Sequence, residues 1–300
     1  MDRNDFPVSL NLSTPRLDIE VLIWAWNCRL FISPGELEKA KSQKLNWFAS
    51  YLFPEAEEGV LKGTMKFFLW LFLVDDLLDS ENQDSSQEFL NQLLNHKTGS
   101  SCGRFDVFLE VLPEIKVWWE SLGGEKWQKA WKENWEHYLD GLRWEFQNKK
   151  NGIRPNLSDY RLFRPYFSGV FLAIHLLRLP DLVESCESNL LEGKIARLIC
   201  LCNDLSSAEK EKQVGDFNNE LLLMIVEHRI SPIQAKTYLV TEIKNLSKDI
   251  KLLTVQSAKS SLSCTDWTRR LNLLLGGCLF WASQDTNRYQ STLNGHTIKL

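Results

Sequence analysis

Residues 68–79 read Phe-Leu-Trp-Leu-Phe-Leu-Val-Asp-Asp-Leu-Leu-Asp, an apolar run that ends in three carboxylates. At helical pitch Asp75 and Asp79 are four residues apart and therefore share one face of a helix. Phe68 and Phe72 lie on the same face, seven and three residues before Asp75. An aromatic face that leads to paired anions leaves negative charge uncompensated, so a cation is expected there. Carboxylate oxygens without nearby Cys or His suit a hard ion such as Mg2+.

A second group of oxygen donors lies far along the chain. Asn203, Ser207 and Glu211 stand at i, i+4 and i+8 and form one stripe of a predicted helix. Amide, hydroxyl and carboxylate oxygens are all hard donors, and Mg2+ typically takes few protein ligands and gains the others from water and substrate phosphates. Two such groups that faced each other across an apolar cavity would hold a diphosphate above a hydrocarbon chain.

The apolar periodicity predicts helices throughout, with expected ranges of Glu36–Phe53, Glu58–Asp79, Glu125–Asn148 and Ser158–Leu179. No segment combines period-two alternation with β-branched enrichment. No Pro/Gly/Ser-rich linker divides the 300 residues. The sequence therefore predicts an all-α protein with a single domain over residues 1–300 around one apolar cavity.

Two of these helices carry features of their own. Trp127, Trp131 and Trp135 form a stripe at helical spacing, which is typical of core packing rather than of a pocket. Pro165 and Gly169 lie inside the helix expected after Ser158, where they predict a kink. A broken helix exposes backbone carbonyls, which can stabilise a nearby positive centre.

Four short motifs together resemble those of class I terpene synthases. Asp75-Asp76-Leu77-Leu78-Asp79 is similar to their DDxxD motif, and Asn203–Glu211 matches their second metal motif, (N/D)Dxx(S/T)xxxE, at every defined position. Tyr160–Arg164 resembles their YxxxR segment, and Arg288-Tyr289 resembles their C-terminal Arg-Tyr pair. The resemblance covers roughly residues 45 to 290, with the motifs in the family's order.

The resemblance implies a role for each matched residue. Metal ligands would be Asp75, Asp79, Asn203, Ser207 and Glu211, which would hold a Mg2+ cluster, usually of three ions, with Mn2+ as a possible substitute. Diphosphate contacts would come from Arg164, Lys210, Arg288 and Tyr289. Phe68, Phe72 and Trp281 would stabilise a carbocation, and the helix break at Gly169 would help to trigger ionisation.

Some assignments stay open at this point. Arg161 is the rival of Arg164 as the residue that senses diphosphate, since it lies three residues earlier on roughly the same face. Asp79 is either a direct metal ligand or the partner that orients Arg288. We expect Arg288 to engage only when diphosphate and Mg2+ are present. Residues 1–20 are expected to be a flexible segment and residues 290–300 a mobile tail.

The function that the resemblance implies is Mg2+-dependent ionisation and cyclisation of an acyclic prenyl diphosphate. A single α-domain of this length most resembles bacterial sesquiterpene synthases, so farnesyl diphosphate is the expected substrate and geranylgeranyl diphosphate the second choice. A chain-elongating prenyl diphosphate synthase is the nearest enzyme alternative, but it carries a second DDxxD, which this chain lacks. A non-catalytic helical binding protein is the alternative from another class, and it predicts loss of at least one charged motif.

The bulk properties exclude several other classes. A net charge of -4 without a dense Lys/Arg stripe gives no reason to expect a nucleic-acid partner. The longest apolar run, Phe67–Val74, is far below the roughly 20 residues that span a bilayer. The first residues lack a secretory apolar region, and seven cysteines without a CxxC pair are typical of a reducing compartment. We therefore expect a cytoplasmic enzyme, either a monomer or a homodimer.

Overall fold

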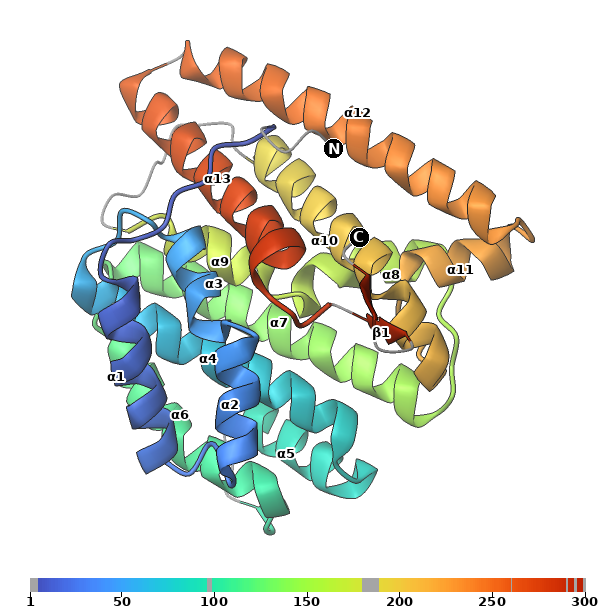
Figure 1. The fold of residues 1–300 in the computed structure, drawn as a ribbon. Coiled ribbons are helices and arrows are strands. Elements are labelled where there is room, and N and C mark those ends of the chain that lie inside the picture. Colours follow the sequence, from blue (N-terminus) through green and yellow to red (C-terminus); the bar gives the residue numbers. More distant parts are fainter. Residues whose placement is uncertain are drawn as a thin grey trace.

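The computed structural model of the chain describes residues 5–95, 99–179, 189–259, 261–289, 291–293 and 296–298. These residues form helices α1 (Thr14–Asn27), α2 (Pro34–Ser42), α3 (Leu45–Leu52), α4 (Glu58–Ser80), α5 (Gln83–Asn95), α6 (Asp106–Glu120), α7 (Glu125–Lys150), α8 (Leu157–Phe167), α9 (Val170–Leu176), α10 (Asn189–Val214), α11 (Glu220–Glu227), α12 (Pro232–Ala258) and α13 (Leu262–Phe280). A 3₁₀ turn (Gly103–Phe105), a π-helical turn (Trp281–Asp285) and an antiparallel hairpin of β1 (Ser291–Leu293) and β2 (His296–Ile298) complete them. The expected all-α fold is confirmed (Figure 1).

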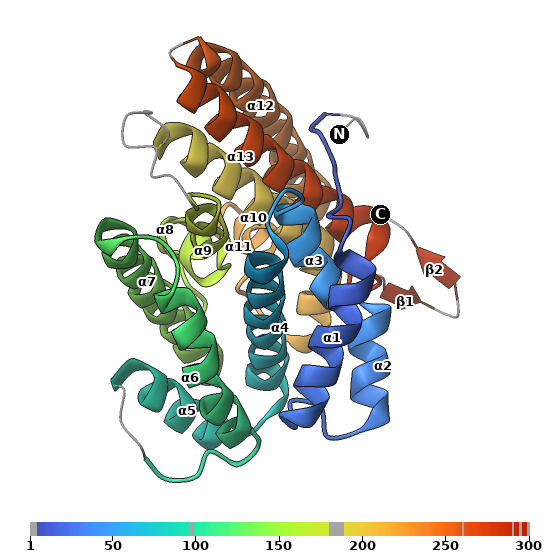
Figure 2. The ribbon, with the colours of Figure 1, turned by 90° about the vertical axis from the view of Figure 1, so that its left-hand side faces the viewer.

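Helix α4 runs through the middle of the molecule. Figure 2 shows it between α6 and α7 on one side and α1 and α3 on the other. Phe67, Leu69 and Trp70 are fully buried, and the Trp70 indole Nε1 donates a hydrogen bond to the Phe108 carbonyl at 3.0 Å. A helix that is apolar on all sides must be buried, so the run before Asp75 fixes α4 at the centre.

Helix α7 forms a wall beside α4 and confirms the packing role of its tryptophans. Trp127, Trp131 and Trp135 are all buried. The ring of Trp131 lies 5.6 Å from that of Phe67 on α4, and the Trp135 ring lies 6.4 Å from that of Trp70. These aromatic contacts join the two helices into one core.

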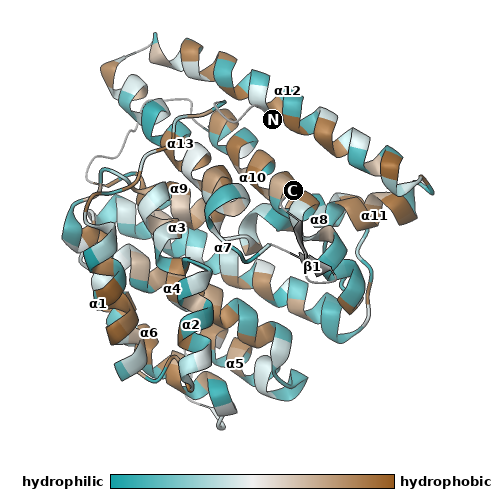
Figure 3. Ribbon diagram, viewed as in Figure 1, coloured by the Kyte–Doolittle hydropathy of each residue, from teal (hydrophilic) through white to brown (hydrophobic). Residues whose placement is uncertain are grey.

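Helices α10, α12 and α13 form the opposite side of the bundle, where α12 packs on α10 and α13 (Figure 1). Helix α12 is the outermost of the three, and apolar and polar residues alternate along its length (Figure 3). It begins with a capping box, in which the Ser231 hydroxyl accepts from the Gln234 amide and the Gln234 side chain accepts from the Ser231 amide. Its apolar positions cover α10 and so shield the helix that carries the second motif.

The kink expected near Pro165 is confirmed as a complete break between α8 and α9. Gly169 adopts φ +71° and separates the two helices. Left-handed backbone is accessible to glycine without a Cβ clash, so the glycine permits the change of direction. The chain is thereby bent at the pocket, which Gly169 lines.

Two expectations about helices and termini need correction. The range Glu36–Phe53 forms two helices, α2 and α3, because Lys44 adopts φ +52° and ends the first one. Within residues 1–20, which we expected to be flexible, Phe6 and Leu17 are buried in the core and α1 begins at Thr14. The tail expected at residues 290–300 contains the paired strands β1 and β2, and its mobility stays a prediction.

Candidate active site

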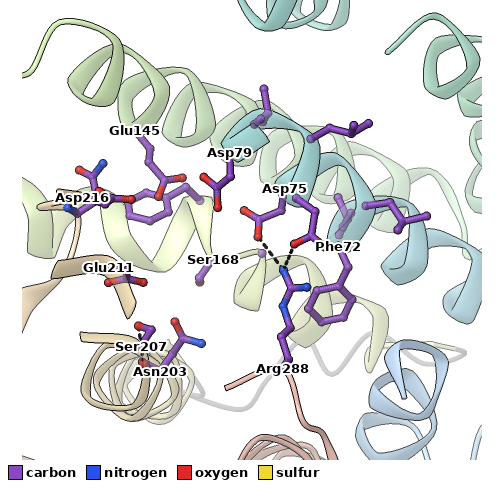
Figure 4. Close-up of a pocket in the computed structure, with 18 of the residues that line it drawn as sticks. Phe72, Asp75, Asp79, Glu145, Ser168, Asn203, Ser207, Glu211, Asp216 and Arg288 are labelled. Atoms are coloured by element: carbon purple, nitrogen blue, oxygen red, sulfur yellow. Dashed lines mark hydrogen bonds and ion pairs between the residues drawn. The ribbon is translucent and has the colours of Figure 1, made fainter. Parts of the chain in front are cut away.

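One pocket of about 990 Å³ lies between α4, α7, α10 and the segment after α13. Asp75 and Asp79 on α4 lie on one side of it, and Asn203, Ser207 and Glu211 on α10 lie on the other (Figure 4). The two donor groups predicted from the sequence are therefore brought together. Apolar side chains from α3, α4, α9 and α13 line the rest of the pocket.

The carboxylates of Asp75 and Asp76 share a single guanidinium. Arg288 Nη2 lies 3.1 Å from Asp75 Oδ2 and 2.7 Å from Asp76 Oδ1. Lys39 gives Asp76 a second cation at 3.0 Å. Burial is the largest single effect and opposes ionisation of Asp76, but Arg288 and Lys39 together outweigh it, so the pKa of Asp76 is lowered. The Asp76 carboxylate therefore forms ion pairs with two basic side chains.

The environment of Asp75 is different. Its side chain is 55% exposed, and it lines the pocket. The protein around it reduces solvation of the anion and raises the pKa of Asp75; Arg288 opposes this effect and Asp79 adds to it. The carboxylate has one cation partner beside several anions, and a further cation in the pocket would stabilise it.

The two corrections at the first motif concern Arg288 and Asp79. We expected Arg288 to await a bound diphosphate, but it has two carboxylate partners within the chain. One alternative for Asp79 was that it orients Arg288. The structure instead bonds Arg288 to the carboxylates of Asp75 and Asp76. Asp79 Oδ1 lies 2.8 Å from Lys149 Nζ. Asp79 thus contacts Lys149 of α7, whereas Asp76 contacts Lys39 of α2.

A buried network holds the second motif in place. Arg164 Nε donates to Asp204 Oδ1 at 2.8 Å, and its Nη2 donates to Asn203 Oδ1 at 2.7 Å. The Tyr160 hydroxyl donates to Asp204 Oδ2 at 2.7 Å. Asn219 at the start of α11 donates to Glu211 Oε2 at 2.7 Å. These bonds fix the rotation of α10, so that its oxygen stripe faces the pocket.

The surroundings of Glu211, the ionisable residue of the second donor group, disfavour its charged form. Burial raises the pKa of Glu211 to about 7, with the neighbouring Asp204 as the next cause. The Ser207 hydroxyl donates to the Asn203 carbonyl at 2.9 Å, which is the usual back-bond of a helical serine. Glu211 therefore lies in a place where a nearby cation would strongly favour its charged form.

Arg164 and Arg161 differ in where they lie. Arg164 lines the pocket and is buried, whereas Arg161 is partly exposed and forms an ion pair with Glu220 Oε1 at 2.7 Å. Lys210 and Tyr289 also line the pocket. The Tyr289 hydroxyl accepts a hydrogen bond from Asn203 Nδ2 at 3.1 Å, which joins the C-terminal segment to α10.

The aromatic wall contains a residue that the sequence did not indicate. Phe68, Phe72 and Trp281 line the pocket as expected, and Phe48 on α3 stands among them. Its ring lies 5.3 Å from Phe68, 5.2 Å from Phe72 and 4.8 Å from Trp281. Phe48 is distant in sequence from every motif, so only the packing of α3 on α4 identifies it.

A charged cluster at the pocket is a second feature that motif reasoning missed. Lys149 on α7 lies 2.8 Å from Asp79, 2.8 Å from Asp216 and 3.9 Å from Glu145. Burial raises the pKa of Glu145 to about 8; Lys149 opposes this, and Asp75 adds to it. Glu145 and Lys149 continue the line of Tyr138 along α7, which is the signal that could have revealed them.

The donor set fits a hard divalent cation. Asp75, Asn203, Ser207 and Glu211 offer carboxylate, amide and hydroxyl oxygens, and Arg164 uses one of the two lone pairs of the Asn203 amide oxygen. Within the described ranges no three His, Cys, Asp or Glu side chains converge as a metal site. The fit therefore depends on amide, hydroxyl and substrate oxygens, as is usual for Mg2+.

Comparison with known proteins agrees with this geometry. Residues 66–249, which include both donor groups, match the sequence model of terpene synthase family 2, C-terminal metal binding. The chain belongs to this family. It is a class I terpene synthase, and the sequence-based assignment of family and enzyme class is confirmed.

Characterised relatives include microbial cyclases. The chain is 24% identical over 260 residues to 4-epi-cubebol synthase of Streptosporangium roseum, which is described as cyclising (2E,6E)-farnesyl diphosphate; the match covers 80% of this chain and 76% of the relative. It is 23% identical over 302 residues to germacrene A synthase of Nostoc punctiforme, with coverage of 95% and 93%. The crystal structure of an α-eudesmol synthase superposes with a TM-score of 0.78 at 19% identity, covering 92% of this chain and 96% of that one.

None of the helices among the described residues is long and apolar enough to cross a membrane.

Proposed function

We propose that this terpene synthase ionises farnesyl diphosphate in a Mg2+-dependent reaction and cyclises the resulting cation to a sesquiterpene. The observation that carries the proposal is the position of Asp75 opposite Asn203, Ser207 and Glu211 at one pocket with an aromatic wall. When bound, Mg2+ would neutralise the diphosphate as it leaves. Geranylgeranyl diphosphate is the second candidate substrate.

The basic side chains of the pocket would receive the diphosphate. Arg164, Lys210 and Arg288 line the pocket with their cationic side chains, and Tyr289 adds a hydroxyl. Charge-assisted hydrogen bonds from these groups stabilise a phosphate as its negative charge grows. The bond between C1 of the prenyl chain and the diphosphate oxygen would break with its electron pair leaving on the diphosphate, and the carbon chain would become an allylic cation.

The aromatic wall would then direct the cation. Ring faces of Phe48, Phe68, Phe72 and Trp281 attract positive charge, at about 0.5–2 kcal/mol each. Water must be kept away from the cation until a proton is lost from carbon, because early capture would give an alcohol. Ser168 and Gly169 at the helix break line the pocket, and backbone carbonyls of this break would stabilise the charge next to the departing diphosphate.

The choice of farnesyl diphosphate draws support from the relatives. The 4-epi-cubebol and T-muurolol synthases are described as cyclising (2E,6E)-farnesyl diphosphate, and both align with about three quarters of this chain or more. A pocket of about 990 Å³ is at the upper end of the usual range for small ligands, so its size admits a longer chain as well. Chain length is therefore the point that the experiment must decide.

Incubation of the protein with geranyl, farnesyl and geranylgeranyl diphosphate in Mg2+, followed by gas chromatography, tests the proposal. We expect cyclic sesquiterpenes from farnesyl diphosphate at the highest rate, with Mn2+ as a weaker substitute. A further sample with isopentenyl diphosphate tests the elongation alternative. A longer prenyl diphosphate product would replace the proposal by that alternative, and no product from any substrate would favour a non-catalytic binding protein.

A further inference from the structure

The segment that carries Arg288 and Tyr289 is bound to the turn between α2 and α3. The Trp281 indole Nε1 donates to the Lys44 carbonyl at 2.9 Å, and the Thr286 hydroxyl donates to the Gln43 carbonyl at 2.6 Å. Trp281 and Thr286 are both buried, at 1% and 3% exposure. The carbonyls of two consecutive residues of the turn therefore accept hydrogen bonds from the segment that follows α13.

Side chains of the turn make two further contacts with the same segment. Lys44 Nζ forms an ion pair with Asp285, and Gln43 Oε1 accepts a hydrogen bond from Arg288 Nη1 at 3.2 Å. The Thr286 hydroxyl also accepts from the Arg288 backbone amide at 3.1 Å. Thr286 thus links the turn to the backbone of Arg288, and Gln43 contacts the guanidinium group of Arg288.

Both partners have unusual backbone conformations at the place where they meet. Lys44 adopts φ +52°, which is uncommon for a residue other than glycine and needs surrounding structure to hold it. Trp281–Asp285 forms a π-helical turn, closed by the bond from the Thr286 amide to the Trp281 carbonyl at 3.0 Å. Such turns are rare and are found frequently at functional sites. The π turn redirects the chain out of α13 and toward the pocket.

From these contacts we infer that Gln43 and Thr286 are positioning residues that hold Arg288 at the pocket. The inference rests on the proposed function, in which Arg288 binds diphosphate. The guanidinium of Arg288 lies against Asp75 (Figure 4) and also bonds to Asp76. The Arg288 backbone amide donates to the Thr286 hydroxyl. The α2–α3 turn therefore aligns the arginine in advance, and diphosphate binding needs less ordering of the C-terminal segment.

Thr286→Val is the decisive variant because it keeps the side-chain volume and removes the hydroxyl that bonds to the Gln43 carbonyl and to the Arg288 amide. Thr286→Ser keeps the hydroxyl and serves as the conservative rescue. Thr268→Val is the matched control, since Thr268 is equally buried on α13 and its hydroxyl donates to the Thr265 carbonyl at 3.0 Å away from the pocket. A comparison with this control separates the positioning role from a general loss of stability.

The first readout is hydrogen exchange of residues 281–289 in protein without added substrate or metal. Thr286→Val should raise exchange there by at least about tenfold over Thr268→Val, whereas Thr286→Ser stays within about twofold of the natural protein. Binding of inorganic diphosphate with Mg2+, measured by calorimetry, should weaken by about 5- to 20-fold in Thr286→Val only. The alcohol fraction of the products should rise in the same variant, because a loose segment admits water.

Gln43→Leu supplies a second test if Thr286→Val does not fold, since it removes only the contact with the Arg288 head. It should weaken diphosphate binding by about threefold with an unchanged melting temperature. Exchange and diphosphate affinity in Thr286→Val that match those of Thr268→Val would overturn the inference, as would unchanged affinity in Gln43→Leu. Exchange is measured without substrate, so a failure of the proposed function would leave this result interpretable.

Discussion

At the residue scale, charges in the pocket are balanced by pairs that join different helices. Asp75 and Asp76 share Arg288, whereas Asp79 pairs with Lys149 of α7. The three carboxylates of one short motif therefore do not share a single partner: Asp76 adds an ion pair with Lys39 of α2, and Asp79 pairs with α7 instead. Asp75 lines the pocket and its surroundings raise its pKa, so a divalent cation bound there would stabilise its charged form.

The cluster around Lys149 gives the first prediction. Lys149→Met should lower the free energy of unfolding by about 1–3 kcal/mol, because it leaves the carboxylates of Asp79, Glu145 and Asp216 without their shared cation. Urea denaturation measures the change. Lys150→Met is the control: Lys150 lies 4.0 Å from the fully exposed Asp84, and its replacement should cost within about 0.5 kcal/mol. Equal effects of the two variants would contradict the account of the cluster.

His175 gives the second prediction, on pH. Burial lowers the pKa of His175 to about 4 from an ordinary value of 6.5, and its ring nitrogen Nε2 lies 3.1 Å from the Trp127 carbonyl. Between pH 6.5 and pH 4 the histidine is protonated in the unfolded chain but not in the folded one. The contribution of His175 to the free energy of unfolding is therefore fully present above pH 6.5 and is lost as pH falls toward 4. The loss attributable to His175 is about 2 kcal/mol between pH 7.5 and pH 5.

Denaturation of the natural protein and of His175→Gln at both pH values measures this effect, since other titrating groups contribute equally to the two proteins. Between pH 7.5 and pH 5 the free energy of unfolding should fall by about 2 kcal/mol less in His175→Gln than in the natural protein. An identical pH dependence in the two proteins would show that the buried histidine does not contribute.

At the element scale, the break between α8 and α9 is the clearest link between sequence and site. Pro165 and Gly169 predict a kink, and the structure places a left-handed Gly169 at the pocket. The break also ends α8 just past Arg164, so that its guanidinium reaches Asp204 and Asn203 on α10. The same break in the backbone therefore positions Arg164 and forms part of the pocket wall.

Gly169→Ala is the third prediction. A Cβ at this position would meet its nearest neighbour, Tyr138 Cε2, at 3.9 Å, which is ordinary contact. The cost therefore comes from the backbone, at about 1–2 kcal/mol of stability. Turnover should fall as well, because a shifted break moves the carbonyls at the pocket. Gly193→Ala on α10 is the control, since it has open space and helical backbone and should stabilise by about 0.5–1 kcal/mol. Thermal unfolding and product formation measure both variants.

The sequence predicted those features that depend on local periodicity and motif spacing. The boundaries of α4 and α7 agree with the expected ranges to within two residues, because both helices have long, strongly patterned faces. The split at Lys44 was missed because a lysine with positive φ has no local signature, and it depends on contacts with the segment after α13. Phe48 and Lys149 were missed for a related reason: their roles arise from packing between helices that are distant in sequence.

At the scale of the whole molecule, α4 and α10 present their oxygen donors to one pocket, and the segment after α13 crosses toward them. Tyr289 contacts Asn203 on α10, and Arg288 contacts Asp75 on α4. The two halves of the bundle are therefore connected by consecutive residues of one short segment. This connection explains why residues so near the end of the chain belong to the site.

Arg288→Ala provides the fourth prediction. It should reduce turnover by about 100-fold or more, because it removes a charge-assisted contact to diphosphate and releases Asp76 from its partner. Tyr289→Phe should cost less than about tenfold, since it loses one neutral hydrogen bond. Arg29→Ala is the matched control, because the Arg29 side chain lies away from the pocket in an exposed ion pair with Glu110 at 3.3 Å. Steady-state rates that are alike for Arg288→Ala and Arg29→Ala would remove Arg288 from the site.

The most direct test of the central claim measures two products in one sample. The protein is incubated with farnesyl diphosphate and Mg2+, and released inorganic diphosphate and extracted cyclic terpenes are quantified together, for the natural protein and for Glu211→Gln. The glutamine can still accept the hydrogen bond from Asn219, so the fold should be kept. We predict equimolar diphosphate and terpene from the natural protein, and at least about 100-fold less of both from the variant at an unchanged melting temperature. Undiminished products from Glu211→Gln, or diphosphate release without any terpene, would contradict the account.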